Sequence, residues 1–457
     1  MTFQQLLLIH PSLKEVYSKM ELQTSIGRKM LLDTEFSTSR AWIEQQWKQI
    51  EQAEAFIDSL DSQAFHHFLC IMSNICDIGG SLSLIEQGQT VDDVALFEIK
   101  TFCINAKQAG KLFVSDLMPV PDLQAAIRLL DPEGLESPRF YIYSAYSEEL
   151  ANKRRQWENA KQSGDEKAMH DLYLQTLELE DAIRERICKE LYVHIPALKQ
   201  AIRNIAQMDI AVSKAMLNRL LGLNKVEIRE EPSLVYNRMF HPVLKQIMLS
   251  KGMRYQDIDC NIDGEVFLIT GANMAGKTVI LKTLAINQLL LQFGFFVGCR
   301  NGRVCLVESV LCSIGDGQNE HEGLSSFASE IIRLNDILNQ MKQGKRHLVL
   351  VDELARTTNP IEGKKLVEGF IRVCSMQKSL TVVTTHYSML QAPCRHMRVR
   401  GFRHERLNPP IDIKQISDHI DYSLVEDDSS QVPTEAINLC KLLGIDKQWI
   451  ELSEMQD

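Results

Sequence analysis

Apolar residues recur at intervals of three or four positions through most of the first half of the chain. The spacing is clear over residues 43–60, 172–191 and 202–220. It matches the period of an α-helix, so we interpret these stripes as the buried faces of core helices. Residues 147–191 hold two strongly charged helical segments on either side of Gln162-Ser163-Gly164-Asp165, a typical turn sequence. This pattern predicts an antiparallel helical hairpin whose longer arm of about 27 residues would reach roughly 40 Å, a length suited to a lever.

The hydrophobic pattern changes near residue 225. Beyond that point, short β-rich runs alternate with helical segments, which predicts an α/β domain. We expect strands at residues 266–270, 304–310, 347–351 and 380–384. The apolar stretch 284–297 is interrupted by Asn287, Gln288 and Gln292, so it predicts a buried helix rather than a membrane span. The chain is therefore expected to form a helical domain over residues 1–225, with the hairpin near 147–191, and an α/β domain over 226–457.

Composition narrows the class of protein. The chain has 457 residues, of which 45% are hydrophobic and 24% charged, enough for two to four globular domains. Its eleven cysteines include no C-x-x-C pair, which indicates reduced thiols rather than a disulfide framework or a zinc site. The N-terminus lacks a basic lead and a small-residue cleavage site. We therefore expect a cytoplasmic protein with no membrane partner.

The net charge of −10 argues against a nucleic-acid-binding protein, because such proteins usually carry a basic surface. The best local basic cluster alternates along one segment and comprises Arg395, Arg398, Arg400, Arg403 and Arg406. We interpret it as an exposed edge strand protected by charge. Binding of phosphate or of a partner is the alternative.

A phosphate-binding loop follows the expected strand at 266–270. The sequence there reads G-x-x-x-x-G-K-T and continues into an apolar helix. Glycines let the backbone N–H groups turn inward on a phosphate, and the helix directs the positive end of its dipole at the same point. A turn that merely joins a strand to a helix would not need the full motif. The predicted nucleotide-binding residues are Gly271, Ala272, Asn273, Met274, Ala275, Gly276, Lys277, Thr278 and Val279.

The roles within this loop follow from the chemistry of a nucleoside triphosphate. Lys277 would reach the β- and γ-phosphates, and the Thr278 hydroxyl would hold Mg²⁺. Two further motifs supply the remaining parts of a nucleotide hydrolase. The strand at 347–351 ends in Asp352 and Glu353, of which the first can support the metal and the second can orient or deprotonate the attacking water. The strand at 380–384 leads to His386, which can sense the γ-phosphate or that water.

These motifs closely resemble those of the MutS family of ATPases in order and spacing. The likeness runs from about residue 20 to about residue 450. The segments that carry it are residues 22–30, 241–243, 271–278, 323–330, 352–363, 385–387 and 434–444. The resemblance implies an α/β ABC-type P-loop NTPase domain with C-terminal dimerisation helices, preceded by an all-α MutS-like core and lever domain.

The resemblance also implies a homodimer with two composite sites for ATP and Mg²⁺. In that family each site takes its phosphate loop from one subunit and a serine at a helix start from the other, and Ser325 matches that serine. The same comparison assigns phosphate and Mg²⁺ binding to Lys277 and Thr278, with the acids and His386 in the roles given above. Adenine contacts are implied near Met253 or Tyr255, of which we take Tyr255 as the candidate, and near Tyr422.

The chain also departs from the family pattern. The family usually has proline, glycine, glycine and glycine at the positions of Ala272, Ala275, Ala355 and Thr357. The sequence begins about where the helical core begins, so we expect no mismatch-wedge domain. A truncated subgroup that shares residues 139–144, 324–330 and 355–360 resembles the MutS-like ATPase encoded with adenosylcobalamin-dependent lysine 5,6-aminomutase.

Three classes of function therefore stay open. The first is a reactivase that uses ATP to open a cobalamin-dependent aminomutase, and the acidic charge favours it. The second is a DNA-binding clamp of the mismatch-repair type, favoured by family membership and by the arginine-rich segment. The third is an ATP-gated structural adaptor.

Overall fold

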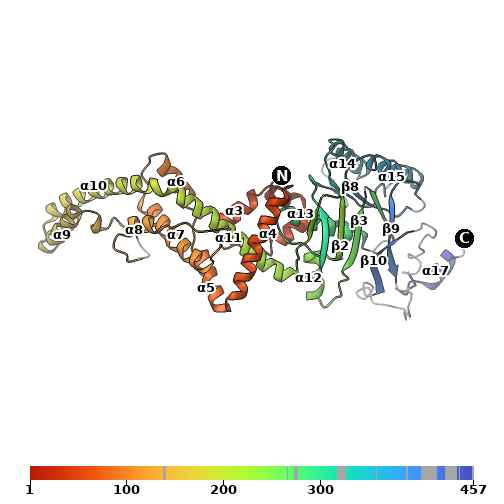
Figure 1. Cartoon of the computed structure of the whole chain (residues 1–457), viewed down its shortest axis with the longest axis horizontal. Coiled ribbons are helices and arrows are strands. Elements are labelled where there is room, and N and C mark those ends of the chain that lie inside the picture. The colour runs from red at the N-terminus through yellow and green to blue at the C-terminus, as the bar shows by residue number, and fades with distance from the viewer. Residues whose placement is uncertain are drawn as a thin grey trace. The chain divides into compact units, whose positions relative to one another are not determined.

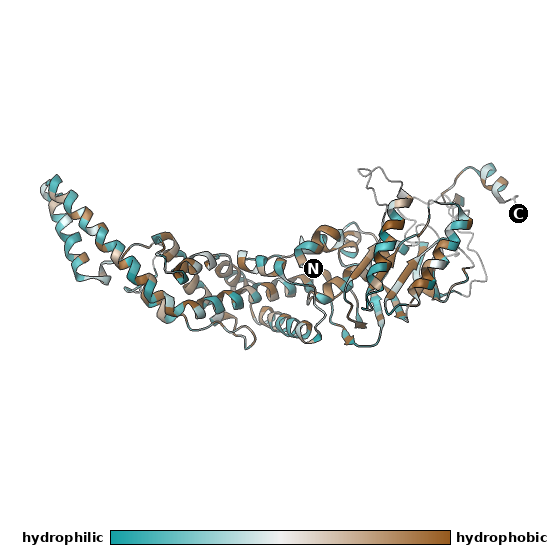
Figure 2. Cartoon of the chain, turned by 90° about the horizontal axis from the view of Figure 1, so that it is seen from above, coloured by the Kyte–Doolittle hydropathy of each residue, from teal (hydrophilic) through white to brown (hydrophobic). Residues whose placement is uncertain are grey.

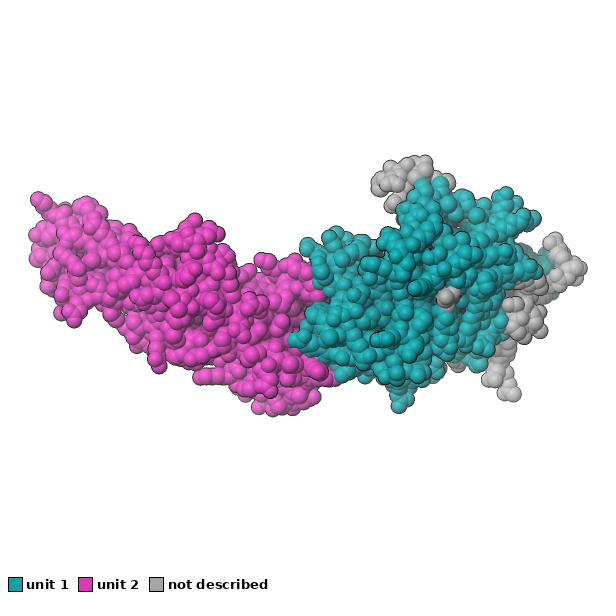
Figure 3. All heavy atoms as spheres, turned by 45° about the horizontal axis from the view of Figure 1, so that its top comes forward, with its two compact units in different colours: residues 1–19, 35–47, 217–457 teal, residues 20–34, 48–216 magenta. Residues whose placement is uncertain are grey.

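The computed structural model describes residues 1–136, 140–264, 266–271, 276–315, 326–356, 358–387, 390–402, 419–427, 440–441 and 443–454. The chain divides into two compact units (Figure 3). Unit 1 comprises residues 1–19, 35–47 and 217–457, and unit 2 comprises residues 20–34 and 48–216. Two N-terminal segments thus cluster with the C-terminal half of the chain.

Helices dominate the chain up to residue 221 (Figure 1). They are α1 (Phe3–Ile9), α2 (Pro11–Tyr17), α3 (Ser25–Asp33), α4 (Arg40–Ser59), α5 (Ser62–Ser73), α6 (Gly79–Glu86), α7 (Asp93–Leu112), α8 (Gln124–Leu130), η1 (Ser144–Tyr146), α9 (Glu148–Ser163), α10 (Glu166–Leu191), η2 (Tyr192–His194) and α11 (Ile195–Leu221).

In unit 2, α9 and α10 form an antiparallel pair. Gly164 has φ 75° and ends α9, because a residue without Cβ enters the left-handed region without strain. Asp165 then caps α10 by accepting a hydrogen bond from the Ala168 backbone N–H. The guanidinium of Arg154 on α9 donates to Glu180 on α10 at 2.7 Å and to the Ile142 carbonyl at 2.6 Å. These contacts tie the two helices to each other and to the segment that precedes them.

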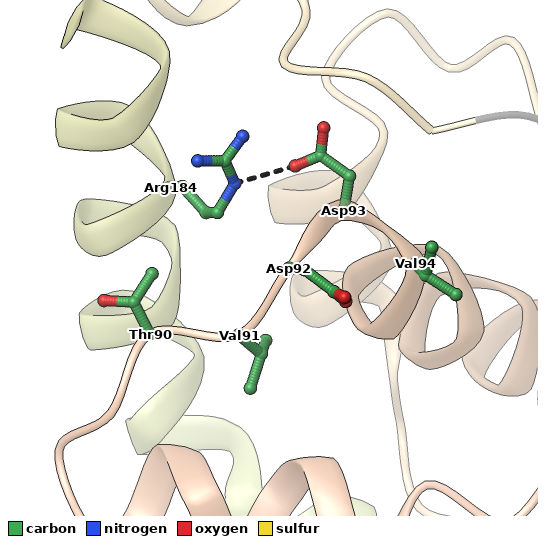
Figure 4. Close-up of a pocket in the computed structure, with 6 residues that line it drawn as sticks. All are labelled: Thr90, Val91, Asp92, Asp93, Val94 and Arg184. Carbon is green, nitrogen blue, oxygen red and sulfur yellow. Dashed lines mark hydrogen bonds and ion pairs between the residues drawn. The ribbon is translucent and has the colours of Figure 1, made fainter. Parts of the chain in front are cut away.

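The base of this hairpin is also tied to α7. Arg184 Nε on α10 donates to Asp93 Oδ1 at 2.8 Å, and both residues line a pocket together with the rest of residues 90–94 (Figure 4). Away from this base the two helices are mostly hydrophilic, with scattered apolar positions (Figure 2). The hairpin is thus held at its base by ion pairs and presents a polar surface along its arms.

Strands begin directly after α11, and all of those named here lie in unit 1. They are β1 (Glu227–Arg229), β2 (Ser233–Met239), β3 (Ile258–Asp263), β4 (Val266–Thr270), β5 (Asn301–Cys305), β6 (Val310–Ser313), β7 (Leu348–Val351), β8 (Leu380–Thr384), β9 (Arg395–Phe402) and β10 (Ile420–Glu426). The helices among them are α12 (Pro242–Ser250), α13 (Lys277–Gln292), α14 (Ser326–Met341), α15 (Pro360–Cys374) and α17 (Lys447–Glu454).

These strands form two sheets. The smaller has the order β1-β5-β2-β3, and the larger has the order β10-β9-β4-β8-β7-β6. In the larger sheet every neighbouring pair is parallel except β10 and β9. Parallel strands are normally buried on both faces, and helices cover this sheet accordingly. One face packs against α14 and α15 through an apolar cluster that includes Leu268, Leu334, Ile337, Val349, Val351, Phe370, Ile371 and Val383. α13 packs against β6, β7 and β8.

Two sequence predictions about strands are wrong. Residues 304–310 do not form one strand, because β5 ends at Cys305 in the smaller sheet and β6 begins at Val310 in the larger. The arginine-rich segment is not an edge strand, since β9 lies between β4 and β10. Arg403 and Arg406 lie outside the described residues, as does most of the predicted closing helix at 434–444.

The apolar stretch after the phosphate loop lies inside unit 1. Asn287, Gln288 and Gln292 on α13 are fully buried, and their amides bond to the backbone of residues 298–307. Within the described part of the chain, no helix has the length and apolar character that crossing a bilayer requires.

His241 gives unit 1 a pH-dependent contact. Burial, together with a smaller effect of the positive charge of Lys282, lowers its pKa to about 4. Its Nδ1 accepts a hydrogen bond from the Leu244 N–H and so caps α12, while its Nε2 lies 3.1 Å from Ser12 Oγ. The imidazole therefore packs in its neutral form.

We expect this histidine to make the protein less stable below neutral pH. The unfolded chain binds the proton near pH 6.5, whereas the folded chain binds it only near the lowered pKa, so stability falls as the pH drops between these values. The loss amounts to roughly 2 kcal/mol between about pH 7.5 and about pH 5. Urea unfolding at both pH values measures it. His241→Asn, which can still cap the helix, should show a smaller loss, and equal losses in the two proteins would contradict the assignment.

Candidate nucleotide-binding site

The predicted site residues meet at one edge of the larger sheet. The phosphate loop follows β4, Asp352 follows β7, and His386 lies two residues beyond β8. These three strands are parallel and stand in the order β4-β8-β7, so their carboxyl ends lie side by side. Ligands of open α/β sheets bind at this edge.

Gly271 and Gly276, at the two ends of the phosphate loop, need the freedom of glycine. Their φ angles are 137° and 81°, values that side chains with a Cβ rarely adopt. Residues Ala272, Asn273, Met274 and Ala275, between them, lie outside the described part of the chain. The loop thus leaves β4 and enters α13 through two left-handed glycines.

Lys277 is the first residue of α13, followed by Thr278 and Val279 in the first turn. Its side chain is 4% exposed, and its Nζ donates to the Gly271 carbonyl at 2.6 Å. The same Nζ lies 3.7 Å from Glu353 Oε1. The ammonium group therefore stands between the phosphate loop and the candidate base.

Asp352 accepts two short hydrogen bonds from threonine hydroxyls. Thr278 Oγ1 donates to its Oδ2 and Thr384 Oγ1 to its Oδ1, both at 2.6 Å. Mg²⁺ in phosphate-transferring enzymes is held by one or two carboxylates together with hydroxyl and phosphate oxygens. Among the described residues no group of three His, Cys, Asp or Glu side chains is placed to hold a metal. The paired oxygens of Thr278 and Asp352 fit Mg²⁺ that is shared with a phosphate.

Glu353 is held in an unusual backbone conformation. Its φ is 47°, in the left-handed region, which costs a residue with a Cβ about 1 kcal/mol. Its N–H donates to Thr384 Oγ1 at 3.0 Å. Its carboxylate faces cations on both sides, because Oε1 approaches Lys277 and Oε2 lies 3.2 Å from Arg356 Nη1. A water molecule that this carboxylate activates would therefore lie next to the lysine that is predicted to hold the phosphates.

His386 is exposed and lies within the electrostatic influence of the same groups. Partial burial of its ring by neighbouring groups has the largest effect and lowers its pKa, the negative charge of Glu353 raises it, and the charges of Lys277 and Arg356 lower it. The net effect is a pKa below the ordinary value, which favours the neutral imidazole at neutral pH. A neutral imidazole can donate a hydrogen bond at one nitrogen and accept one at the other.

Ala355, where the MutS family usually has glycine, has φ 61°. Two side chains hold this left-handed turn: Glu330 accepts a hydrogen bond from the Ala355 N–H, and the Tyr387 hydroxyl donates to its carbonyl. The Tyr387 ring in turn requires Gly363, since a Cβ there would lie 2.1 Å from the hydroxyl oxygen. The left-handed geometry explains why glycine suits this position, and the two hydrogen bonds explain how alanine is accommodated.

The two tyrosines predicted near the adenine lie in different surroundings. The Tyr255 hydroxyl accepts a hydrogen bond from the His241 N–H at 2.8 Å. The ring of Tyr422 lies against the phosphate loop, because a Cβ on Gly276 would come 3.0 Å from its Cδ1. Gln256 joins the two segments by accepting a hydrogen bond from the Tyr422 N–H and donating one to Asp421. An adenine contact by Tyr255 stays a prediction, as does the role of Ser325, which lies outside the described residues.

Sequence reasoning missed four residues of this site: Arg356, Glu330, Tyr387 and Thr384. Arg356 and Tyr387 lie within three residues of predicted catalytic side chains, so local spacing could have suggested them. Glu330 lies 25 residues from its partner Ala355, and Thr384 is 32 residues from Asp352. Contacts of this kind depend on how strands and helices are placed beside one another.

Comparison with known proteins identifies the domain that carries this site. Residues 267–437 match the family MutS domain V. A protein named endonuclease MutS2 from Staphylococcus epidermidis is 33% identical over 215 residues, which cover 46% of this chain and 27% of that protein. A protein of the same name from Staphylococcus aureus is 31% identical over 215 residues, which cover 46% of this chain and 29% of that protein.

The matched region spans less than a third of either relative, so the likeness concerns a domain and not whole proteins. It includes the phosphate loop, both acids and His386. Residues 267–437 thus match MutS domain V, and the similarity to the MutS family is shown for this domain.

Proposed function

We propose that this chain is a Mg-ATP-dependent ATPase that dimerises around ATP and couples hydrolysis to movement of its helical arms. The observation that carries the proposal is the meeting of Lys277, Asp352 and Glu353 at one sheet edge. Phosphoryl transfer needs positioning and charge stabilisation, and these three groups supply both.

Each residue of the candidate site has a definite task in the proposed reaction. Lys277 and the loop N–H groups bind the phosphates, and Thr278 with Asp352 hold Mg²⁺, which neutralises charge on the phosphate oxygens when bound. Glu353 orients the attacking water and accepts its proton. His386 donates a hydrogen bond from its neutral ring toward the γ-phosphate. Ser325 of a second copy completes the site in the proposed dimer.

For the client we propose a cobalamin-dependent aminomutase, on which the chain acts as a reactivase. The net charge of −10 favours a protein partner over nucleic acid. Two arginines of β9 are paired with acids, which lowers the positive potential of this strand: Arg395 pairs with Asp263 and Glu426, and Arg400 pairs with Asp421. The alternative is a DNA-binding clamp of the mismatch-repair type, favoured by the relatives named endonuclease MutS2.

One ATPase experiment tests the activity and separates the two clients. We expect Mg²⁺-dependent hydrolysis by the full chain, stimulation by a mutase inactivated with damaged cobalamin, and little change with duplex or mismatched DNA at physiological salt, because the net charge of −10 opposes binding to a phosphate backbone. Active, undamaged mutase is the control. A steep, salt-sensitive rise with DNA would favour the clamp, and absence of hydrolysis under all conditions would contradict the ATPase assignment.

A further inference from the structure

Thr384 joins the two acids of the candidate site although it belongs to neither motif. It is the last residue of β8 and is fully buried. Its hydroxyl donates to Asp352 Oδ1 at 2.6 Å and accepts from the Glu353 N–H at 3.0 Å. Strand β8 lies between β4, which leads into the phosphate loop, and β7. The Thr384 side chain therefore contacts Asp352 and Glu353, the first two residues after β7.

The first of these bonds determines how the Asp352 carboxylate is turned. Its two oxygens are bonded to different threonines, Thr384 at Oδ1 and Thr278 at Oδ2. Hydrogen bonds from hydroxyls to carboxylates at this length are strong. With Oδ1 held by Thr384, rotation of the carboxylate is restricted and Oδ2 stays directed at Thr278, where the metal would lie.

The second bond acts on the backbone of the candidate base. Glu353 has φ 47°, and residues with a Cβ keep such a conformation only where their surroundings hold them in it. The Thr384 oxygen accepts the hydrogen bond of the Glu353 N–H in this conformation. A single hydroxyl therefore acts on the carboxylate of one acid and on the main chain of the other.

We propose that Thr384 is a positioning residue for hydrolysis, whose hydroxyl aims the Asp352 carboxylate at Mg²⁺ and holds Glu353 in the conformation that directs its side chain toward the attacking water. This inference rests on the proposed ATPase function. Residues that orient metal ligands typically change metal affinity or activity by about 10- to 100-fold when they are removed.

Thr384→Val tests the proposal, since valine keeps the shape of threonine and lacks the hydroxyl. The primary measurement is the Mg²⁺ concentration at which the full chain half-maximally binds a non-hydrolysable ATP analogue, followed at equilibrium without turnover. We expect this midpoint to rise about 10-fold and kcat to fall at least about 10-fold. Thr384→Ser, which keeps the hydroxyl, should lie within about 3-fold of wild type in both quantities.

Thr381→Val is the matched control. Thr381 is also fully buried on β8, and its hydroxyl bonds to neither acid. We expect this variant to keep the wild-type Mg²⁺ midpoint. If Thr384→Val does not fold, as judged by urea unfolding, Thr384→Ala replaces it in the same measurements.

The outcomes separate this inference from the proposed function. Wild-type protein that fails to bind the analogue at any Mg²⁺ concentration overturns both. Wild-type protein that binds, together with an unchanged midpoint in the valine variant, overturns the role of Thr384 alone. The role is likewise overturned if serine behaves as valine does, or if Thr381→Val shifts the midpoint equally.

Discussion

Replacing Glu353 with glutamine is expected to lower the rate of ATP hydrolysis by about 100-fold or more while ATP binding is retained. Glutamine has nearly the same shape, yet it cannot accept the proton of the attacking water, and general bases contribute roughly 100- to 10,000-fold. Because ATP is not consumed, we also expect the ATP-bound dimer to persist. Single-turnover hydrolysis and light scattering with Mg-ATP measure the two effects.

Glu308→Gln provides the matched control for this substitution. Glu308 forms a surface ion pair with Lys345, outside the candidate site, and surface pairs of this kind contribute little. We expect wild-type hydrolysis from this variant. Hydrolysis at the wild-type rate in Glu353→Gln would refute the assignment of the base, and a single subunit that encloses the bound nucleotide would refute the shared site.

Replacing Lys277 with alanine is expected to weaken ATP binding by about 100-fold or more. Truncation removes the ammonium group at the start of α13 that is predicted to hold the β- and γ-phosphates, and loss of one partner of a buried charged contact costs about 2–5 kcal/mol. It also removes the lysine contacts with Gly271 and Glu353. Calorimetric titration with a non-hydrolysable ATP analogue measures the change.

Lys282→Ala controls for the general effect of removing a positive charge from α13. Lys282 lies five residues further along the same helix and is exposed. We expect its ATP affinity to remain within about 2-fold of wild type, since exposed charges are screened by solvent and salt. Equal weakening in both variants would show that net charge, not a phosphate contact, governs binding. Urea unfolding of Lys277→Ala establishes that the variant is folded.

The strands that carry the nucleotide motifs could be predicted because their patterns are local. Residues 266–270 and 380–384 were expected as strands, and the bounds of β4 and β8 confirm both. Both are short runs rich in apolar and β-branched residues, followed by a glycine or by polar residues, the pattern of a strand buried on both faces. Local hydrophobicity is sufficient for such strands.

The prediction at residues 304–310 failed because the chain passes there from one sheet to the other. The Val307 backbone bonds to the side chain of Gln292 on α13 through both its N–H and its carbonyl. A buried amide side chain thus takes the place of a neighbouring strand. The local run of apolar residues does not reveal whether the backbone hydrogen bonds go to a neighbouring strand or to a buried side chain.

The prediction that the arginine-rich segment is an edge strand failed for a related reason. Alternating charge is typical of an edge strand, but β10 covers β9 and supplies Asp421 and Glu426 as partners. Those partners come from a segment more than twenty residues away in the sequence. Charge alternation reveals that side chains need solvent or partners, and it does not reveal which.

The sequence by itself determined which chemical groups the candidate site contains: a lysine and a threonine after a glycine-rich loop, two acids after one strand and a histidine after another. Short motifs carry such information because the residues of each motif act at fixed spacing. Only the tertiary structure decided that Thr384 joins Asp352 to Glu353, and that Glu330 and Tyr387 hold the turn at Ala355. These contacts link residues more than twenty positions apart, and strand order and helix packing, rather than local sequence, bring them together.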